Sequence, residues 1–270
     1  MARFAPVAPL SLHQQLSERG LLGNYHLLIA PKVLDKPEAY QDFYRYWRRP
    51  SETFVIMDNG VIETEDPGNA EMLMKASLLV GADVTILPDI PDDAEATLQI
   101  ALPVAEKLHS TGHKVIPVLQ GTTLRQVQAC ARSYEKHIPY FQGFAVPRSL
   151  VNQLGNRHEV VEYLANQFKG YTVHLLGLSD SLTNDLYTAN VYDNVVGVDS
   201  AIPVHMSYLI LREWSSKRPK RPKDYWDWTS NRGGWANENV RRIRGWLNDV
   251  NFVPTKLGGL SVQMETPEAE

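Results

Sequence analysis

The feature that most constrains this fold is a regular alternation of short β-rich runs with longer amphipathic stretches from about residue 24 onward. Such alternation is typical of repeated βα units that build a parallel sheet. Strands are predicted over 24–30, 53–58, 83–89, 114–120, 141–146, 171–177 and 194–200. Helical patterns lie between them, at about 67–80, 92–111, 123–137, 157–168, 181–191 and 203–214, with a last helix near 235–250. The order of elements predicts an α/β fold.

The length of the chain, 270 residues, fits one barrel of the TIM type. Such barrels have eight βα units and run to about 250 residues as a single domain. Because no further strand is evident after residue 214, we expect an irregular eighth unit. The expected organisation is one domain over residues 1–254, with 212–250 as a basic and aromatic C-terminal insertion plus the last helix, and a flexible tail over 255–270.

Composition and charge narrow the functional classes. No apolar run reaches the ~20 residues that span a bilayer, and the first residues lack the layout of a signal peptide, so we expect a cytoplasmic protein, in a host cell if it is viral. The single cysteine, Cys130, excludes an internal disulfide and any zinc site built from several cysteines. It lies in a helical pattern and is expected to be a buried core thiol. The net charge of −4 gives no global reason to expect nucleic acid, although Lys and Arg cluster over 212–244.

Acidic residues end several of the predicted strands. Asp58, Asp89 and Asp199 each follow an apolar run directly. Ligands of parallel α/β folds bind at the carboxyl ends of the strands, where such side chains converge. A carboxylate there is costly unless it caps a helix, binds a partner or reacts. Helix capping is the alternative interpretation for each aspartate taken singly. Together, the aspartates indicate an acidic site at one mouth of the barrel.

An amide and several glycines join this predicted rim. Gln120 adds a planar hydrogen-bonding group, and Gly60, Gly143 and Gly177 allow close approach of the backbone. Such a set suits a flat heterocycle, because a carboxylate can accept two N–H groups from a guanine-like edge while an amide donates to its carbonyl.

Other kinds of site find little support in the sequence. No glycine-rich phosphate-binding motif is present, so a nucleotide phosphate cradle is not predicted. His26 and His174 lie within predicted strands and, without carboxylates at ligand spacing, are expected to be core or rim histidines. We therefore predict neither a metal nor a cofactor.

The motifs MDNG, LPDIPDD, PVLQGTT, GFAVP, VHLLGLS and GVDSAIP occur in the order and approximate spacing of the active-site motifs of tRNA-guanine transglycosylases. The resemblance covers about residues 24–205 and is nearest to the archaeal, archaeosine-type branch. That family is a TIM barrel that exchanges a guanine in a polynucleotide for a 7-deazaguanine without cutting the strand. The resemblance implies that Asp199 is the nucleophile, Asp58 the second catalytic aspartate and Asp89 the reader of the base.

The same resemblance implies the rest of the base-binding set. Gln120 corresponds to the glutamine that reads the base carbonyl, and Gly143 to a position that gives a backbone N–H. Leu176 and Gly177 correspond to the wall of the pocket. Asn59 and Gly121, which adjoin the motif residues, are placed in the base-binding set as well.

The chain departs from the family in two respects. It lacks the zinc subdomain, which needs three cysteines and a histidine, and it lacks the C-terminal RNA-binding domain of the archaeal enzymes. A compact, zinc-free chain resembles the phage-type paralogues that insert 7-deazaguanines such as preQ0 into DNA. The implied partners are DNA and a free 7-deazaguanine base. Because C1′ is hidden in a stacked duplex, the target nucleotide must be flipped out or single-stranded.

A segment rich in basic and aromatic residues, about 212–235, is predicted to bind the nucleic acid. Its cations can neutralise phosphates and its aromatic rings can stack on bases. The predicted contacts are Lys217, Arg218, Lys220, Arg221, Lys223, Tyr225, Trp226, Trp228 and Arg232. The alternative is a solvated charged loop whose aromatic side chains pack into the end of the barrel.

Three other functions remain open at this point. The chain could be a tRNA transglycosylase that obtains its RNA-binding parts from a partner subunit. It could be a catalytically silent barrel that binds nucleic acid. It could also be a glycosidase that hydrolyses the base away, because the same carboxylate chemistry then uses water as the acceptor.

Overall fold

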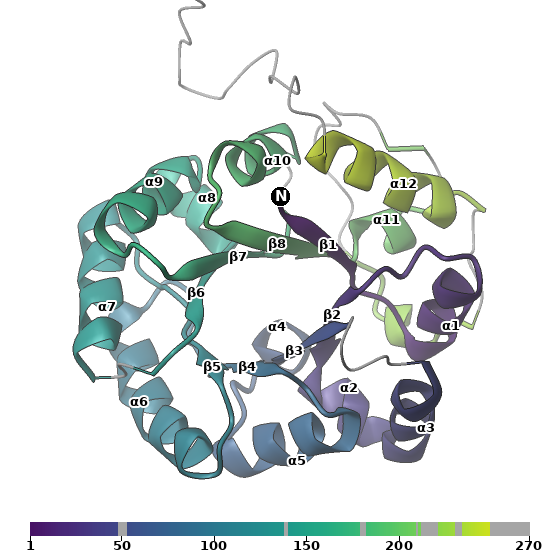
Figure 1. Cartoon of the computed structure of the whole chain (residues 1–270), viewed down its shortest axis with the longest axis horizontal. Helices are drawn as coiled ribbons and strands as arrows, with labels where there is room; N and C mark the ends of the chain where they lie inside the picture. Colours follow the sequence, from purple (N-terminus) through teal and green to yellow (C-terminus); the bar gives the residue numbers. More distant parts are fainter. Residues whose placement is uncertain are drawn as a thin grey trace, which may run out of the picture.

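The computed structural model describes residues 1–47, 53–137, 140–178, 182–208, 210–211, 221–229 and 234–248. Within these residues, eight parallel strands form a ring that is surrounded by helices (Figure 1). The strands are β1 (Arg3–Pro6), β2 (Tyr25–Ile29), β3 (Phe54–Asp58), β4 (Val84–Ile86), β5 (Val115–Ile116), β6 (Gly143–Pro147), β7 (Thr172–Leu176) and β8 (Val195–Ser200). The prediction of a TIM-type barrel is confirmed.

The ring closes at the N-terminus of the chain. Hydrogen bonds join the strands in the orders β1-β8-β7-β6 and β2-β3-β4-β5. Strand β1 pairs with β8 so that Ala5 lies opposite Asp199, and an isolated bridge between Val118 and Ala145 joins the two sets near β5 and β6. The eighth strand therefore precedes residue 24, and the expectation of an irregular unit after residue 214 was wrong. The segment RFAP has only four residues and ends in proline, too short to show a periodic pattern.

Helices cover the outside of the ring, and short helices follow some of the strands at their carboxyl ends. Two long helices begin as their sequences indicate, because Asn69 and Asp93 accept hydrogen bonds from the first-turn N–H groups of Met72 and Ala96. The helices are α1 (Leu10–Glu18), α2 (Ala30–Asp35), α3 (Pro37–Trp47), α4 (Val61–Thr64), α5 (Ala70–Val80), α6 (Ala94–Ser110), α7 (Leu124–His137), α8 (Ser149–Leu154), α9 (His158–Gln167), α10 (Leu182–Val191), α11 (Ile202–His205), η1 (Tyr225–Asp227) and α12 (Ala236–Leu247).

One of the two predicted C-terminal helices is shorter than expected, and the other is present. The helix expected over 203–214 ends at His205, and residues 209 and 212–214 lie outside the described part of the chain. Helix α12 contacts α10, α11 and β1 and takes the place of the missing long helix in the outer ring (Figure 1). The predicted last helix is therefore part of the outer layer of the barrel. The predicted flexible tail, 255–270, lies outside the described residues.

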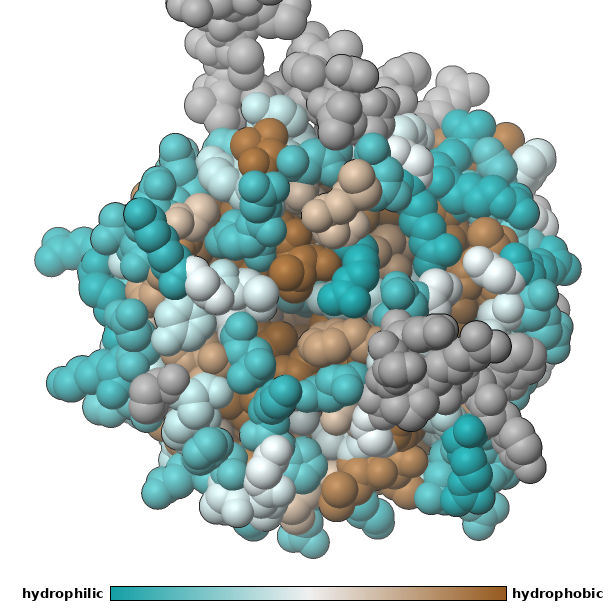
Figure 2. Space-filling model, in the orientation of Figure 1, coloured by the Kyte–Doolittle hydropathy of each residue, from teal (hydrophilic) through white to brown (hydrophobic). Residues whose placement is uncertain are grey.

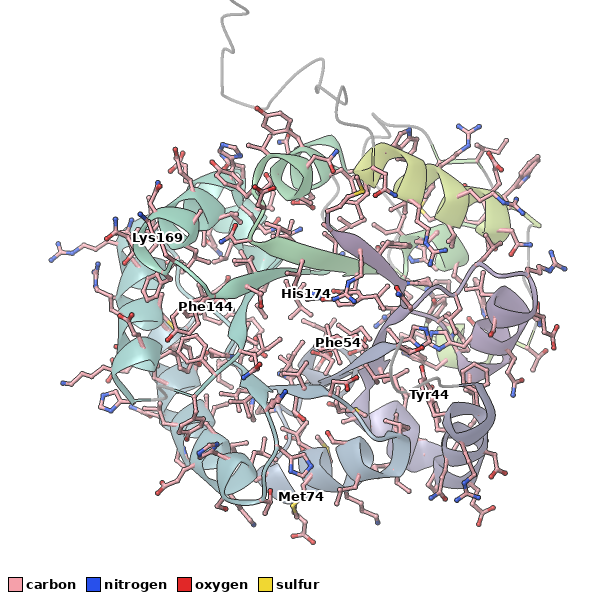
Figure 3. The ribbon with its side chains drawn as sticks, viewed as in Figure 1. Tyr44, Phe54, Met74, Phe144, Lys169 and His174 are labelled. Carbon is pink, nitrogen blue, oxygen red and sulfur yellow. The ribbon has the colours of Figure 1, made fainter. Side chains whose placement is uncertain are left out.

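Two hydrophobic clusters stabilise the barrel. A small one fills the ring with residues such as Tyr25, Ile56 and Ala145, and a larger one lies between the strands and the helices. Figure 3 shows Phe54 and His174 inside the ring, whereas Phe144 lies between β6 and the outer helices. Alternate residues of each strand thus face opposite layers.

The surface of the barrel differs between the outer helices and the centre of the ring. In the view of Figure 1 the short helix α4 lies at the back, so the strands begin on the near face and end on the far one. Figure 2 shows that hydrophilic residues cover the outer helices on the near face and that hydrophobic residues gather toward its centre. Among the described helices none is both long and apolar enough to cross a membrane.

The single cysteine behaves as expected. Cys130 lies in α7 and is 1% exposed. Burial, above all, raises the pKa of its thiol to about 11, so the thiolate is scarce at neutral pH. The prediction of a packed core thiol is confirmed.

Candidate functional site

The three predicted aspartates lie at the same end of the barrel. Asp58 is the last residue of β3, Asp89 follows β4, and Asp199 is the last residue but one of β8. The strands are parallel, so these ends meet at the mouth where the βα loops gather. Burial raises the pKa of Asp58 well above its ordinary value, and the charges of Glu63, Asp199 and Asp89 raise it further. The mouth is therefore an acidic, partly desolvated site.

The environment of Asp58 disfavours the charged form of its carboxyl. Its side chain accepts a hydrogen bond at Oδ2 from the backbone N–H of Gly60, at 3.2 Å, and the residue is only 9% exposed. Gly60 has a φ of +79°, and a Cβ there would lie 2.8 Å from Pro31 Cδ, so the turn requires glycine. Because the charged form is disfavoured, the carboxyl stays protonated to a higher pH than an exposed aspartate does.

Asp89 is held by two side-chain amides. Asn59 Nδ2 donates to its Oδ1 at 2.7 Å, and Gln120 Nε2 donates to its Oδ2 at 2.6 Å. Gln120 is itself oriented, because its Oε1 accepts from the N–H of Asp92 at 3.0 Å. Burial raises the pKa of Asp89, whereas the two amide hydrogen bonds lower it. The result is a carboxyl whose plane is fixed.

Asn59 has a different role from the one predicted. Its Nδ2 donates to both Asp89 Oδ1 and the carbonyl of Leu87, and its Oδ1 accepts from the N–H of Val61. An amide nitrogen has two N–H groups, and both are used here. Asn59 therefore holds Asp89 in place, and the expectation that it contacts the base is corrected.

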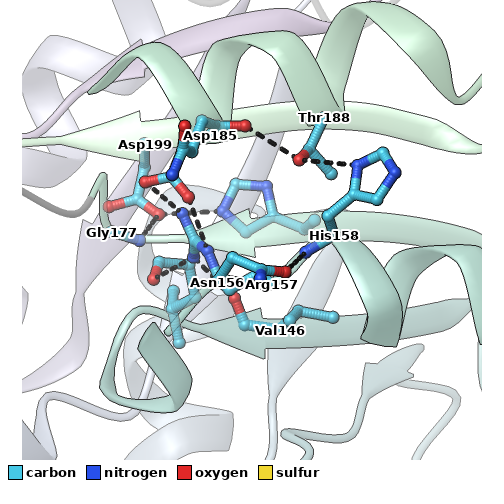
Figure 4. Close-up of polar contacts among 11 residues, drawn as sticks. Val146, Asn156, Arg157, His158, Gly177, Asp185, Thr188 and Asp199 are labelled. Atoms are coloured by element: carbon cyan, nitrogen blue, oxygen red, sulfur yellow. Dashed lines mark hydrogen bonds and ion pairs between the residues drawn. The ribbon is translucent and has the colours of Figure 1, made fainter. Parts of the chain in front are cut away.

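Asp199 is held through one of its two carboxylate oxygens. Its Oδ1 accepts hydrogen bonds from His174 Nε2, at 2.9 Å, and from the backbone N–H of Gly177, at 2.8 Å (Figure 4). No donor from the described residues contacts Oδ2. Gly177 has a φ of +68°, the left-handed conformation that glycine adopts readily, and this turns its N–H toward the carboxylate.

His174 was expected to be a core or rim histidine, but the structure places it directly behind Asp199. It lies in β7 opposite Gly197 of β8, and its ring points into the barrel (Figure 3). The signal was present in the strand VHLLG, where His174 and Leu176 share the inward face. Pattern alone could not say that the histidine faces an aspartate.

Sequence reasoning also missed Arg157, which is 1% exposed. Its Nε donates to Asp185 Oδ1 at 2.9 Å, and its Nη2 lies 2.8 Å from Asp185 Oδ2. Its Nη1 donates to the carbonyl oxygens of Val146 and Leu176, at 2.8 and 3.2 Å (Figure 4). Arg157 thus fastens the ends of β6 and β7 to α10, immediately beside Gly177.

A fourth acid, Glu63 of α4, was also missed. Its Oε1 lies 2.5 Å from Arg221 Nη2. Burial raises the pKa of Glu63, and the charge of Arg221 opposes that shift. The Arg221 guanidinium also lies 5.5 and 5.3 Å from the ring centroids of Tyr225 and Trp226. Arg221 is therefore part of the wall of the site, and its predicted role as a phosphate contact stays a prediction.

The predicted nucleic-acid segment is described only in part. Lys217, Arg218, Lys220 and Arg232 lie outside the described residues, and Lys223 is exposed.

Its aromatic residues largely pack inward. Tyr225 is fully buried and donates its hydroxyl to Val7 O, and Trp228 is 5% exposed, so neither ring can stack on a base as predicted. Trp226 is half-buried and packs with Leu176 against the cluster inside the barrel. For Tyr225 and Trp228 the alternative interpretation, packing into the barrel end, is correct.

The remaining predicted base-binding residues fall at both ends of the barrel. Gly121 follows Gln120 with a φ of +147°, and Leu176 and Gly177 lie at the end of β7. Gly143, however, is the first residue of β6 and pairs with Thr172 at the start of β7. Its N–H is therefore remote from the mouth, and its predicted role is corrected. A Cβ at this position would collide with the Thr172 carbonyl, which explains the glycine.

Comparisons with known proteins show the fold. No protein-family model matches the sequence, and no curated protein matches it. The YdjI aldolase from Escherichia coli K12 is similar in structure, with a TM-score of 0.58, 13% identity, and coverage of 94% of this chain and 93% of that one. The 3-keto-D-glucoside 4-epimerase YcjR from E. coli has a TM-score of 0.51 at 10% identity, over 91% of this chain and 100% of that one. At such identities the likeness shows the TIM-barrel fold alone.

Metal binding has no support in the described residues, among which no group of three or more histidines, cysteines and acids has the arrangement to hold a metal ion.

Proposed function

We propose that this protein is a base-exchanging transglycosylase that replaces guanine in DNA with a 7-deazaguanine through a covalent bond to Asp199. One observation carries the proposal. Asp199 has an oxygen without a donor from the described residues, at the same mouth where burial raises the pKa of Asp58 and two amides fix Asp89. A nucleophile, an acid and a reader of a planar hydrogen-bonding edge are the groups that base exchange requires.

In the first displacement, Asp199 Oδ2 attacks C1′ of the target deoxyguanosine. The bond between C1′ and the base nitrogen breaks, and its electron pair leaves with the guanine. The proton of Asp58 moves to the departing base, so guanine leaves as a neutral molecule. The raised pKa of Asp58 supports this role, because the acid must still carry its proton when the substrate binds.

In the second displacement, a ring nitrogen of the 7-deazaguanine attacks C1′ on the covalent intermediate. The ester bond breaks and its electron pair returns to Asp199, while the ionised Asp58 accepts the proton of the incoming nitrogen. Each step inverts C1′, so the product keeps the original configuration. Asp58 ends each cycle protonated, and no other reactant is needed.

Asp89 and Gln120 suit recognition of the base. Each oxygen of the Asp89 carboxyl accepts one amide hydrogen bond and has a further lone pair. Those lone pairs can accept the two N–H donors of a guanine edge, and the second N–H of Gln120 can donate to the neighbouring carbonyl oxygen. Leu176 and Trp226, which both pack at the mouth, provide apolar contacts for a flat ring.

DNA is favoured over tRNA as the polymer because the chain has one cysteine and so cannot build the zinc subdomain of the tRNA enzymes. A tRNA transglycosylase that needs a partner subunit is the second candidate, on the same site chemistry. The test is incubation of the purified protein with labelled guanine or preQ0 and either DNA or tRNA. We expect label in DNA, and label in tRNA alone would overturn the choice. Abasic sites without label would instead identify a hydrolase.

The nucleophile is tested with Asp199→Asn, which should abolish a protein–DNA adduct that survives denaturation and lower turnover by more than about 10⁴-fold. Asp193→Asn is the matched control, because Asp193 is an exposed aspartate just before the same strand. Exchange that persists in Asp199→Asn would refute the assignment.

A further inference from the structure

We infer that Tyr25 and His174 are positioning residues that hold Asp199 by its Oδ1 and so make Oδ2 the attacking atom. We call the chain of hydrogen bonds from Tyr25 through His174 to Asp199 the relay. The inference rests on the proposed function for what Asp199 attacks, but the relay itself can be tested without any activity.

The direction of each hydrogen bond in the relay follows from the groups involved. Tyr25 Oη lies 2.8 Å from His174 Nδ1, and His174 Nε2 lies 2.9 Å from Asp199 Oδ1. An ionised carboxylate can only accept, so Nε2 carries the hydrogen. In a neutral imidazole Nδ1 is then an acceptor, and the Tyr25 hydroxyl donates to it. Burial raises the pKa of Tyr25, which keeps the phenol protonated and able to donate.

The surroundings leave Tyr25 and His174 little freedom to move. Each is 1% exposed, deep in the barrel. The Tyr25 ring stacks on Phe54 with centroids 5.8 Å apart and an interplanar angle of 9°, and the Arg3 guanidinium lies 4.4 Å from the Tyr25 centroid. Rotation of the phenol would break these contacts as well as its hydrogen bond. The hydroxyl is therefore fixed on His174.

Gly197 makes room for the relay. It lies opposite His174 in the pairing of β7 with β8. A Cβ at Gly197 would collide with three atoms of the Tyr25 ring, including its hydroxyl oxygen. Gly197 has no left-handed conformation that would otherwise explain a glycine in the middle of a strand. The explanation that remains is close packing, which lets the Tyr25 side chain reach His174.

The relay has a consequence for each half of the reaction. With Oδ1 occupied by His174 and by the N–H of Gly177, Oδ2 is the oxygen that no donor from the described residues contacts. A carboxylate that is already held in the attacking orientation loses less entropy in the transition state, which lowers the barrier. When the ester to C1′ breaks in the second displacement, the same two donors stabilise the returning negative charge.

The relay itself is tested by nitrogen NMR of the ¹⁵N-histidine-labelled protein, with the His174 signals assigned by their loss in His174→Gln. We expect the Nε2–H tautomer in the wild type and a clear shift of the Nδ1 signal in Tyr25→Phe. Tyr44→Phe is the matched control, since Tyr44 Oη lies 3.0 Å from His26 Nδ1 in a second tyrosine–histidine pair away from the mouth. The Nδ1–H tautomer, or an unchanged Nδ1 signal in Tyr25→Phe, would overturn the inference.

The kinetic arm measures single-turnover adduct formation and, separately, DNA affinity. His174→Leu should slow adduct formation about 100-fold, the usual effect of a misplaced reacting group, with little change in Kd. His174→Gln, which retains an N–H donor, should recover part of the rate, and Tyr44→Phe should match the wild type.

Gly197→Ala should slow the same step, and circular dichroism identifies any variant that fails to fold. Adduct formation at the wild-type rate in folded His174→Leu would contradict the inference. If the wild type forms no adduct, the proposed function fails, and the NMR result alone decides on the relay.

Discussion

At the scale of single residues, the mouth gathers more negative charge than its cations balance. Asp58, Glu63, Asp89 and Asp199 interact there, and Arg221 forms an ion pair with only one of them, Glu63. Buried carboxyls of this kind cost stability when they ionise, because water no longer solvates the charge. The site is therefore expected to be a source of instability in the folded protein.

Asp58→Asn should make the protein more stable at neutral and alkaline pH while abolishing the proposed base exchange. The folded-state pKa of Asp58 lies well above the ordinary value of 3.8, so the folded state binds this proton more tightly than the unfolded chain does. The bound proton therefore stabilises the folded protein at pH values below the ordinary pKa of aspartate. This stabilisation is lost as the pH rises through the raised pKa of Asp58. Asparagine has no charge to desolvate, and we expect a gain of about 1 kcal/mol in the free energy of unfolding.

Urea unfolding over a series of pH values measures this gain, which should shrink as the solution becomes acidic. The exposed Asp193→Asn serves as the control and should leave the free energy of unfolding unchanged at every pH. A loss of stability in Asp58→Asn at neutral pH would contradict the expectation.

Arg157→Met should lower the free energy of unfolding by about 3–5 kcal/mol, because Asp185 would remain buried without its guanidinium partner. The carbonyl oxygens of Val146 and Leu176 would lose a donor as well. Chemical denaturation measures the loss. The double variant Arg157→Met/Asp185→Leu should recover part of it, and Arg132→Met, at an exposed arginine of α7, should have little effect. A loss below about 1 kcal/mol would show that the ion pair is not needed.

At the scale of elements, strand β1 is held on several sides. It pairs with β8, α12 packs against it, and η1 is fastened beside it by the hydrogen bond from Tyr225 to Val7 O. A further bond, from Ser11 Oγ to Trp228 O at 2.7 Å, joins α1 to the residue after η1. A four-residue strand gains little from pairing alone, so these contacts keep the ring closed.

Tyr225→Phe should therefore destabilise the protein by about 1–3 kcal/mol, since the buried Val7 carbonyl loses this donor while the ring still fills its site. Thermal unfolding followed by circular dichroism measures the change. Tyr208→Phe is a suitable control because Tyr208 is 55% exposed. An equal effect of the two substitutions would show that the bond to β1 contributes nothing.

Much of the element order was predictable, and the exceptions have physical causes. The long amphipathic helices α5, α6, α7 and α9 and the apolar strands carry strong periodic patterns, so each was found in the sequence. Strand β1 has too few residues for a period, and α11 ends early although its sequence continues as a helical pattern. In both cases tertiary contacts decide the structure, and no local window contains them.

The site was predictable where a residue type and a strand end coincide. Asp58, Asp89, Gln120 and Asp199 follow apolar runs and lie at the mouth as expected. The supporting residues were not predictable. Arg157, for instance, resembles any exposed cation at a helix start, and only the fold shows that it is buried against carbonyl oxygens.

At the scale of the whole molecule, the net charge of −4 opposes binding to a polyanion. Under the proposed function, affinity for DNA must then come from local cations, and Lys223, two residues after Arg221, is an exposed one. We expect Lys223→Gln to reduce the slope of log affinity against log salt by about 0.7 for single-stranded DNA. Fluorescence anisotropy at several salt concentrations gives the slope. Lys75→Gln, on the outer helix α5, should leave it unchanged, and an unchanged slope in Lys223→Gln would remove this residue from the interface.

The pairing of β1 with β8 couples the order of the first residues to the position of Asp199, the proposed nucleophile. Ala5 lies opposite Asp199, and the N–H of Val7 donates to Ser200 O at 2.9 Å. The N-terminal strand therefore lies beside Asp199, the proposed nucleophile. During synthesis the N-terminal segment must wait for β8 to emerge before it can pair. Fraying of the N-terminus, or a fusion that pulls on it, should therefore reach Asp199 before it disturbs any other part of the barrel.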